Sequence, residues 1–217
     1  MSIAKLSIVK IIIYKKNGII YFCCMLGLKL ATDPRWVNLA EMAIEDILTD
    51  HAYCEQKAAS TCIALIQQHP ERELMVQKLV PVVSEEWTHF KLVLDELKQR
   101  GLKLGAQRKD EYVHELNKFF TKGNTRETRF LDNLLMAALI EARSCERFRL
   151  LSIEIADDGL RQFYHKLMIA EATHYRLFLD LAEYYFDKKK VKKRWNEWLD
   201  YETKVLKLLE LRGDRMH

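Results

Sequence analysis

The sequence contains very few of the residues that interrupt helices. Only 7 glycines and 3 prolines occur among its 217 residues. Because these two residues are the least compatible with a helix interior, their scarcity favours long helices joined by short connections. Apolar residues make up 49% of the chain and charged residues 30%, as is typical of a globular protein with its own core. The formal net charge of +4 permits a polyanionic partner but does not require one.

Cysteines and long apolar runs are scarce as well. The five cysteines form no Cys-x-x-C pair and show no zinc-site spacing: Cys23, Cys24, Cys54, Cys62 and Cys145. An odd number of cysteines without such pairs argues against a secreted disulfide framework and favours structural thiols in a reducing cytosol. The longest uninterrupted apolar run, 19–28, has about half the length of a membrane span. We therefore expect a cytoplasmic protein without a membrane partner.

Residues 1–32 differ in composition from the rest of the chain. They are apolar and rich in β-branched side chains, interrupted by Lys10, Lys15, Lys16 and Asn17. Two interpretations stay open. Asn17-Gly18 favours a tight hairpin turn between two short strands; alternatively, translation starts at Met25 and the preceding residues are not native. We assign no function to this segment.

From residue 33 onward the apolar residues recur at helical spacing. Caps, glycines and prolines divide this region into expected helices at 33–69, 71–100, 110–120, 125–156, 160–187 and 191–211, the second of them kinked or broken before Pro81. Four of these are much longer than the usual dozen residues, and short connections make successive helices neighbours. The sequence therefore predicts an all-α domain over 33–217, an antiparallel four-helix bundle with one or two accessory helices.

One helical segment occurs twice. The stretch EEWTHFKLVLDEL (85–97) aligns with AEATHYRLFLDLA (170–182), and both contain Glu-x-Thr-His followed by an aromatic and a basic residue. Each copy is preceded by a glutamate on the previous expected helix: Glu55 lies 31 residues before Glu86, and Glu141 lies 30 residues before Glu171. Residues three apart on a helix point in similar directions. The repeat therefore predicts that four carboxylates and two imidazoles converge inside the bundle.

Such a cluster is costly without a counter-charge. Buried carboxylates repel one another, and each needs a compensating partner. Two divalent metal ions satisfy that need, and carboxylate with imidazole suits iron or manganese better than thiol-seeking metals. The pattern matches the ligand set of ferritin-like di-iron and di-manganese proteins. The predicted metal ligands are Glu55, Glu86, His89, Glu141, Glu171 and His174.

Neighbouring polar residues are weaker candidates. A third Glu-x-x-His, Glu111 to His114, lacks the repeated context and is interpreted as an exposed helix face. Glu85 points about 100° away from Glu86 around the helix, so we do not expect it to be a ligand. His51 lies one turn before Glu55 and is expected to contact a ligand or to pack. Metal-bound histidines usually donate to a carboxylate, and sequence alone does not choose among Asp50, Asp95, Asp132 and Asp180. Glu146 is expected at the surface or in a salt bridge.

Three strings carry a resemblance that covers most of the chain. LTDHAYCEQKAAS (48–60), LIEARSCERFRLL (139–151) and EATHYRLFLDLA (171–182) resemble the MiaE family of tRNA hydroxylases, within the ferritin-like superfamily. The resemblance implies an O₂-dependent di-iron monooxygenase that hydroxylates the isopentenyl group of 2-methylthio-N6-isopentenyladenosine in tRNA. It places the metal ligands on the same six positions. It also implies a separate electron donor such as a ferredoxin or reductase, since no flavin or iron–sulfur motif occurs here.

Two regions depart from the resemblance. The segment before Asp33 does not look like the family's usual start, and the family leads us to expect a slightly longer tail than one ending at His217.

A tRNA substrate requires phosphate contacts. The run DKKKVKKRW (187–195) offers Lys188, Lys189, Lys190, Lys192, Lys193 and Arg194 as candidate RNA-binding residues, with Trp195 and Trp198 placed to stack on a base. The simpler interpretation is a solvated lysine run that favours the negative end of a helix dipole. Arg143, Arg147 and Arg149 are further candidates for RNA contact.

Other functions share the same ligands. An iron-storage protein or ferroxidase would also use them, and so would a peroxidase, although the four-cysteine iron domain usual in rubrerythrin-like peroxidases does not occur here. A non-enzymatic RNA-binding bundle with a structural metal is the remaining alternative.

Overall fold

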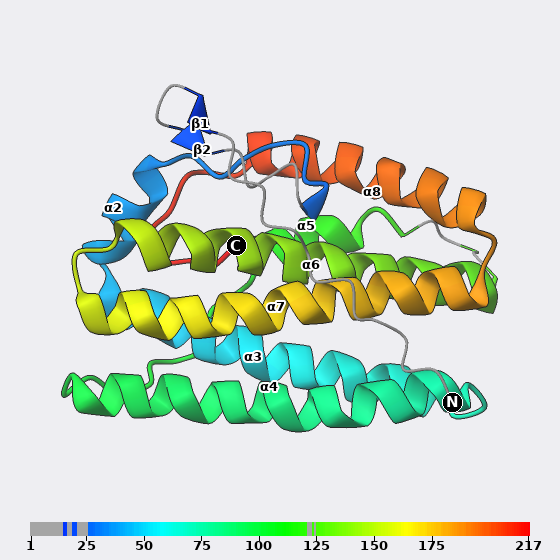
Figure 1. The fold of residues 1–217 in the computed structure, drawn as a ribbon, viewed down its shortest axis with the longest axis horizontal. Coiled ribbons are helices and arrows are strands. Elements are labelled where there is room, and N and C mark those ends of the chain that lie inside the picture. The colour runs from blue at the N-terminus through cyan, green and yellow to red at the C-terminus, as the bar shows by residue number, and fades with distance from the viewer. Residues whose placement is uncertain (1–14, 17–18, 21–25, 121–122, 124) are drawn as a thin grey trace.

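The computed structural model describes residues 15–16, 19–20, 26–120, 123 and 125–217. Within these ranges the chain is almost entirely helical, with seven helices, labelled α2 to α8 as in Figure 1. Two two-residue strands, β1 (Lys15–Lys16) and β2 (Ile19–Ile20), pair antiparallel, with Lys15 opposite Ile20. Asn17, Gly18 and Met25 lie outside the described residues, so the hairpin turn and the alternative start at Met25 both stay predictions. None of the described helices combines the length and apolarity that a membrane span requires.

Four long helices form the bundle. α3 (Ile44–Gln68) and α4 (Glu73–Gln99) pack along each other as one antiparallel hairpin, and α6 (Arg126–Glu154) and α7 (Asp158–Tyr185) form a second. Figure 1 shows the two hairpins facing each other, with α7 beside α4. α8 (Lys188–Leu208) and the short α5 (Glu111–Asn117) cover the outer side of α6. The predicted all-α, four-helix architecture with accessory helices is confirmed.

Polar side chains begin most of these helices. Asp110 accepts a hydrogen bond from the backbone N–H of Val113, and Thr125 accepts one from Thr128. Asp157 and Asp187 cap α7 and α8 in the same way. Because each cap satisfies a backbone donor that has no partner within its helix, these residues fix where the helices start.

Two expected boundaries were wrong. The single helix expected over 33–69 is divided into α2 (Arg35–Glu41) and α3, because Ala43 leaves the helical conformation with φ −134° and ψ 43°. Conversely, α4 continues through Pro81 without interruption. The ring of Pro81 deprives the carbonyl of Gln77 of its helical donor, but both residues are exposed, so that carbonyl lies on a face that is open to water.

The core is divided along the length of the bundle. One apolar cluster contains Leu79, Val82 and Phe178, and the other contains Leu48, Val93 and Leu167. Along α4, the two clusters are separated by Glu86 and His89, which are buried. The described cysteines, Cys54, Cys62 and Cys145, are free thiols. A buried polar layer therefore crosses the middle of an otherwise apolar bundle.

Candidate metal centre

The six predicted ligands come together in that polar layer. α3 contributes Glu55, α6 contributes Glu141, and α4 and α7 each contribute a glutamate and a histidine. All six are buried. They form two overlapping groups whose potential ligand atoms lie within 4.8 Å of one another: Glu55, Glu86, His89 and Glu171 in the first, and Glu86, Glu141, Glu171 and His174 in the second. The grouping assigns one histidine and one unshared glutamate to each half of the site.

Glu86 and Glu171 belong to both groups. The two histidines face this shared pair, with ring centroids 6.1 Å apart. Nδ1 of His89 lies 3.3 Å from Oε2 of Glu86 and 3.6 Å from Oε2 of Glu55. Nδ1 of His174 lies 2.8 Å from Oε1 of Glu86. This is the arrangement that two adjacent cations need, because two carboxylates are in position to bridge them.

The electrostatics of the site show the cost of gathering these charges. Burial raises the pKa of Glu86 to about 7, and burial with the nearby Glu141 raises the pKa of Glu171 well above its ordinary value. Burial also raises that of Glu55, but hydrogen bonds to His51 and His89 outweigh it and leave the pKa lowered. For both histidines burial lowers the pKa, yet the surrounding glutamates raise it to about 10 in His89 and about 9 in His174. The carboxylates of this layer thus favour positively charged partners.

Several buried atoms of the site have no hydrogen-bond partner among the described residues. Oε1 of Glu171 is one of them, and Oε1 of Glu86 and Nδ1 of His174, although 2.8 Å apart, are not aligned for a hydrogen bond. Buried polar atoms are normally hydrogen-bonded, so atoms that lack an aligned partner within one cluster indicate a place for an additional ligand. A carboxylate–imidazole set fits iron or manganese, and the residues present therefore fit a di-metal centre.

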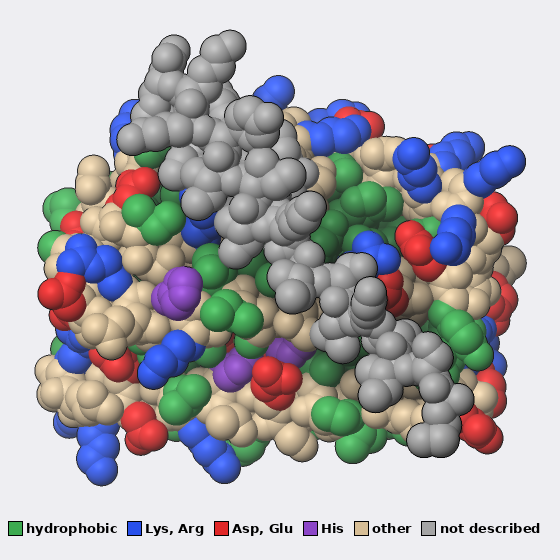
Figure 2. Space-filling view, viewed as in Figure 1, with side chains coloured by type: hydrophobic (Ala, Val, Ile, Leu, Met, Phe, Trp, Pro, Cys, Tyr) green, Lys and Arg blue, Asp and Glu red, His purple; other side chains and the backbone are tan. Residues whose placement is uncertain are grey.

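Two neighbours support the ligands. Nε2 of His51, a fully buried residue, lies 2.6 Å from Oε1 of Glu55, and its ring stacks on Tyr164. Nε2 of His174 lies 3.1 Å from Oε2 of Glu85, a half-exposed residue at the seam between α4 and α7. Figure 2 shows histidine and acidic side chains at the surface along this seam. Sequence reasoning missed Glu85 as a partner because it considered only the direction of Glu85 on its own helix.

The other candidates lie elsewhere. Among the described residues, none of the four aspartates that were considered as histidine partners forms a hydrogen bond or ion pair with His89 or His174. Asp50 and Asp132 bind arginines from the C-terminal region, Asp180 binds Arg176, and Asp95 is exposed. Glu111 and His114 are exposed on α5, as expected. A third group, Cys54, Asp110 and His217, also gathers potential ligand atoms, but Asp110 already pairs with Lys57 and caps α5.

Two arginines in the middle of α6, Arg143 and Arg147, are not available for RNA. Arg143 is fully buried and binds Glu202 and Glu146, so Glu146 takes part in a buried salt bridge. Arg147 is 7% exposed and lies over the ring of Trp36. Expecting Arg143 and Arg147 to contact RNA was therefore wrong. Arg149 is half-buried.

The lysine run occupies the start of α8. Lys188, Lys189, Lys190, Lys192 and Lys193 are all exposed. Because the lysines lie at the start of α8, they are at the positive end of the helix dipole and not at the negative end that would favour them. The first turn of α8 contains no acidic residue. Arg194 differs, because its guanidinium binds Asp132 at 2.6 and 3.0 Å and also Glu197. Trp198 is fully buried and unavailable for stacking, whereas Trp195 is half-buried.

Comparisons with known proteins identify the family of the chain. The model of the family described as tRNA-(MS[2]IO[6]A)-hydroxylase (MiaE) matches residues 24–217. The tRNA 2-(methylsulfanyl)-N(6)-isopentenyladenosine(37) hydroxylase of Pseudomonas putida strain KT2440 is 35% identical over 156 residues, 72% of this chain and 75% of that protein. The enzyme of the same description from Salmonella typhimurium strain LT2 is 26% identical, covering 63% of this chain and 67% of its own.

A solved structure has the same fold. It is described as protein 43 with aldehyde deformylating oxygenase activity from Synechococcus. It superposes with a TM-score of 0.82 at 33% sequence identity, covering 88% of this chain and 94% of its own. The bundle is thus that of a ferritin-like oxygenase. Together with the family match over nearly the whole chain, this shows that the protein belongs to the MiaE family of tRNA hydroxylases.

Proposed function

We propose that this chain is a di-iron monooxygenase that hydroxylates the isopentenyl group of 2-methylthio-N6-isopentenyladenosine in tRNA. The observation that carries the proposal is the convergence of four buried glutamates and two buried histidines in two groups that share Glu86 and Glu171. The names of the Pseudomonas and Salmonella relatives supply the substrate class.

The six residues would act as the metal ligands. Glu55 and His89 would belong to one ligand set, Glu141 and His174 would belong to the other, and Glu86 and Glu171 would belong to both. Two bound iron ions would supply the reductive activation of O₂ and the transfer of one oxygen atom to an unactivated C–H bond. The other oxygen atom leaves as water, which consumes two electrons and two protons. We propose that a ferredoxin or a reductase provides the electrons.

The remaining contributions belong to the protein. His51 holds Glu55 in place through the 2.6 Å contact, and Glu85 holds the ring of His174. The two apolar clusters on either side of the polar layer limit the access of water to the centre. The five exposed lysines at the start of α8 would bind the phosphate backbone of the tRNA.

A ferroxidase or a peroxidase would use the same six ligands, so the substrate decides between these functions. The test is nucleoside mass spectrometry of isopentenylated tRNA after incubation with ferrous protein, an electron donor and O₂. The proposal predicts a hydroxylated nucleoside whose formation requires O₂ and is lost in Glu171→Ala. Rapid iron oxidation that is indifferent to tRNA, with no hydroxylated nucleoside, would contradict it and favour the ferroxidase.

A further inference from the structure

Four polar residues line a pocket at the end of the bundle where α3 ends and α6 begins. They are Gln68, His69, Arg126 and Arg129, and the pocket has a volume of about 360 Å³. Each of these side chains carries N–H donors, and two of them are cations. Among the described residues, no carboxylate belongs to the lining. The chemistry of the lining is that of an anion site.

We propose that this pocket binds a backbone phosphate of the tRNA, at a point separate from the lysine run of α8. The inference rests on the proposed function, since it assumes a tRNA substrate, and it adds the place where one part of that substrate is held.

His69 is a buried member of the pocket whose ring nitrogen lacks a partner. It is only 3% exposed, and its Nδ1 has no hydrogen-bond partner among the described residues. The nearest carboxylate oxygen, Oε1 of Glu71, lies 3.7 Å from Nδ1, which is too far for a hydrogen bond. The ring is fixed against Phe130 at 4.4 Å. A buried ring nitrogen that is held in one orientation without a partner indicates a place for a ligand atom, and the tautomer with its proton on Nδ1 would donate to an anion.

Arg126 and Arg129 place two cations at the start of a helix. Both lie in the first turn of α6, where the positive end of the helix dipole disfavours cations and favours anions. Arg126 is oriented by the carbonyl of Gln68 at 2.6 Å and by Oε1 of Glu71 at 3.0 Å. The side chain of Arg129 is exposed and, within the described part of the chain, makes no hydrogen bond or ion pair. A bound phosphate would make the position of both cations favourable.

A further argument is the connection to the lysine run. The ring of Phe130 contacts that of Phe186 at 5.8 Å, and Nζ of Lys190 lies 5.3 Å from the ring of Phe186. The pocket and the start of α8 therefore occupy the same end of the bundle, at the right of Figure 1. Figure 2 shows Lys and Arg side chains projecting over α8 at this end.

The spacing also fits a nucleic acid. His69 follows Glu55 by 14 residues along α3 and its C-cap, and at 1.5 Å per residue this places the pocket roughly 21 Å from the metal centre. At 3.4 Å per nucleotide along one strand, that span corresponds to about six stacked nucleotides. A tRNA loop with one base at the metal centre can reach the pocket with its backbone.

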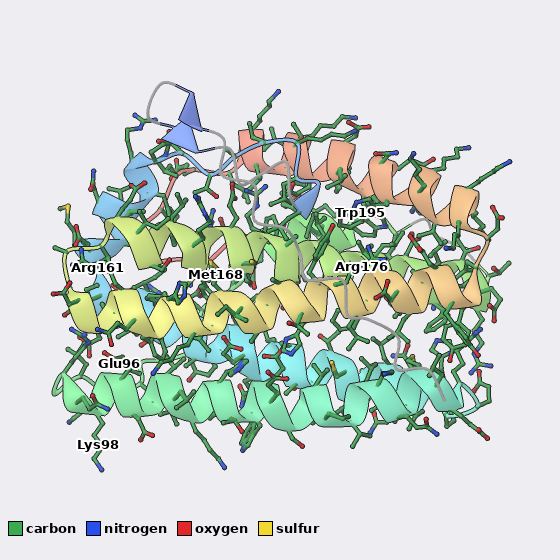
Figure 3. The ribbon with its side chains drawn as sticks, in the orientation of Figure 1. Glu96, Lys98, Arg161, Met168, Arg176 and Trp195 are labelled. Atoms are coloured by element: carbon green, nitrogen blue, oxygen red, sulfur yellow. The ribbon has the colours of Figure 1, made fainter. Side chains whose placement is uncertain are left out.

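The test compares tRNA binding by Arg129→Gln and by the double variant Arg126→Gln, Arg129→Gln with that of the wild type. Lys98→Gln is the matched control, because Lys98 is an exposed cation at the opposite end of the bundle, as Figure 3 shows. Binding is measured at several salt concentrations. Each lost phosphate contact is expected to lower the slope of log K against log salt by about 0.7 to 0.9. We expect about tenfold weaker binding for Arg129→Gln and no change for Lys98→Gln.

Arg126 also binds the last carbonyl of α3, so the double variant is checked for folding and Arg129→Gln carries the test alone if needed. A second readout follows the ring signals of His69 by NMR, assigned through their loss in His69→Gln, during titration with inorganic phosphate and with tRNA. Both ligands are expected to shift the wild-type signals, and neither should shift them in Arg129→Gln.

The outcomes separate this inference from the proposed function. Unchanged tRNA affinity and salt slope in Arg129→Gln, with the wild type still hydroxylating tRNA, would overturn the pocket and leave the function standing. A shift with inorganic phosphate but unchanged tRNA binding would show a site for free anions and overturn the RNA assignment. Weakened tRNA binding in a protein that hydroxylates no tRNA would support the pocket and overturn the function.

Discussion

Replacing a shared ligand is expected to remove both metal ions, whereas replacing an unshared ligand removes only one. The prediction follows from the membership of the two groups. Glu171 belongs to both, so Glu171→Ala leaves three ligands in each set. Glu55 belongs to one, so Glu55→Ala leaves three ligands in the first set and all four in the second.

The magnitude follows from charge and ligand count. Four carboxylates balance two divalent cations, and Glu171→Ala leaves an excess positive charge in a buried layer, where it is expensive. Removing a residue that merely supports a ligand already weakens metal binding by about 10- to 100-fold. Losing a ligand from both sets should cost each site at least about 100-fold, so the iron content falls from about two per chain to almost none. Glu55→Ala should retain about one.

The assay loads each variant with ferrous iron anaerobically, removes unbound metal and measures iron per chain by elemental analysis. Asp95→Ala serves as the control, because Asp95 is an exposed acidic residue of α4, the helix that contributes Glu86 and His89, and it lies outside both groups. Circular dichroism verifies that each variant is folded. Equal iron loss in Glu55→Ala and Glu171→Ala, or two retained irons in Glu171→Ala, would refute the bridging arrangement.

Three further predictions concern single contacts. Glu85→Gln weakens the hydrogen bond to Nε2 of His174 and should therefore weaken iron binding by about 10- to 100-fold at one of the two sites. Iron titration measures both affinities, and two unchanged affinities would mean that Glu85 does not orient His174. Gly213→Ala would place a Cβ 2.1 Å from the carbonyl carbon of Leu39. Overpacking should lower the free energy of unfolding by about 1–3 kcal/mol and Tm by about 2–4 °C for each kcal/mol. An unchanged melting curve would contradict this prediction. Arg143→Met leaves the buried Glu202 and Glu146 without their cation and should lower the free energy of unfolding by about 3–5 kcal/mol. Urea titrations at a fixed metal concentration measure this loss. A loss of less than about 1 kcal/mol would mean that the salt bridges of Arg143 do not stabilise the fold as proposed.

The helices and the six clustered residues could be predicted because their signals are local. Caps such as Asp157 and Thr125 mark where a helix begins, and each cap acts on residues only two or three positions further along the chain. The scarcity of glycine indicates that the helices are long. The doubled Glu-x-x-His fixes two residues on one helix face, and the upstream glutamates repeat with it. Such a pattern can be found by aligning two segments of the sequence, without knowing which helices pack together.

The features that sequence missed depend on contacts between elements. The contact of Glu85 with His174 joins α4 to α7, and the direction of Glu85 on α4 alone does not show it. Arg143 resembles a surface cation in sequence, but Glu202 from α8 covers and neutralises it. The continuity of α4 through Pro81 depends on that face being open to water. The phosphate pocket joins the end of α3 to the start of α6, more than fifty residues apart in the chain.

The most direct test of the central claim is the origin of the oxygen in the product. Ferrous protein is incubated with isopentenylated tRNA and an electron donor under ¹⁸O₂, in parallel with ¹⁶O₂ in H₂¹⁸O, and the digested nucleosides are analysed by mass spectrometry. A di-iron monooxygenase predicts ¹⁸O on the isopentenyl group from O₂ and none from water, with no product from Glu171→Ala. Label taken from water, or no hydroxylated nucleoside from protein with two irons per chain and a competent donor, would contradict the account.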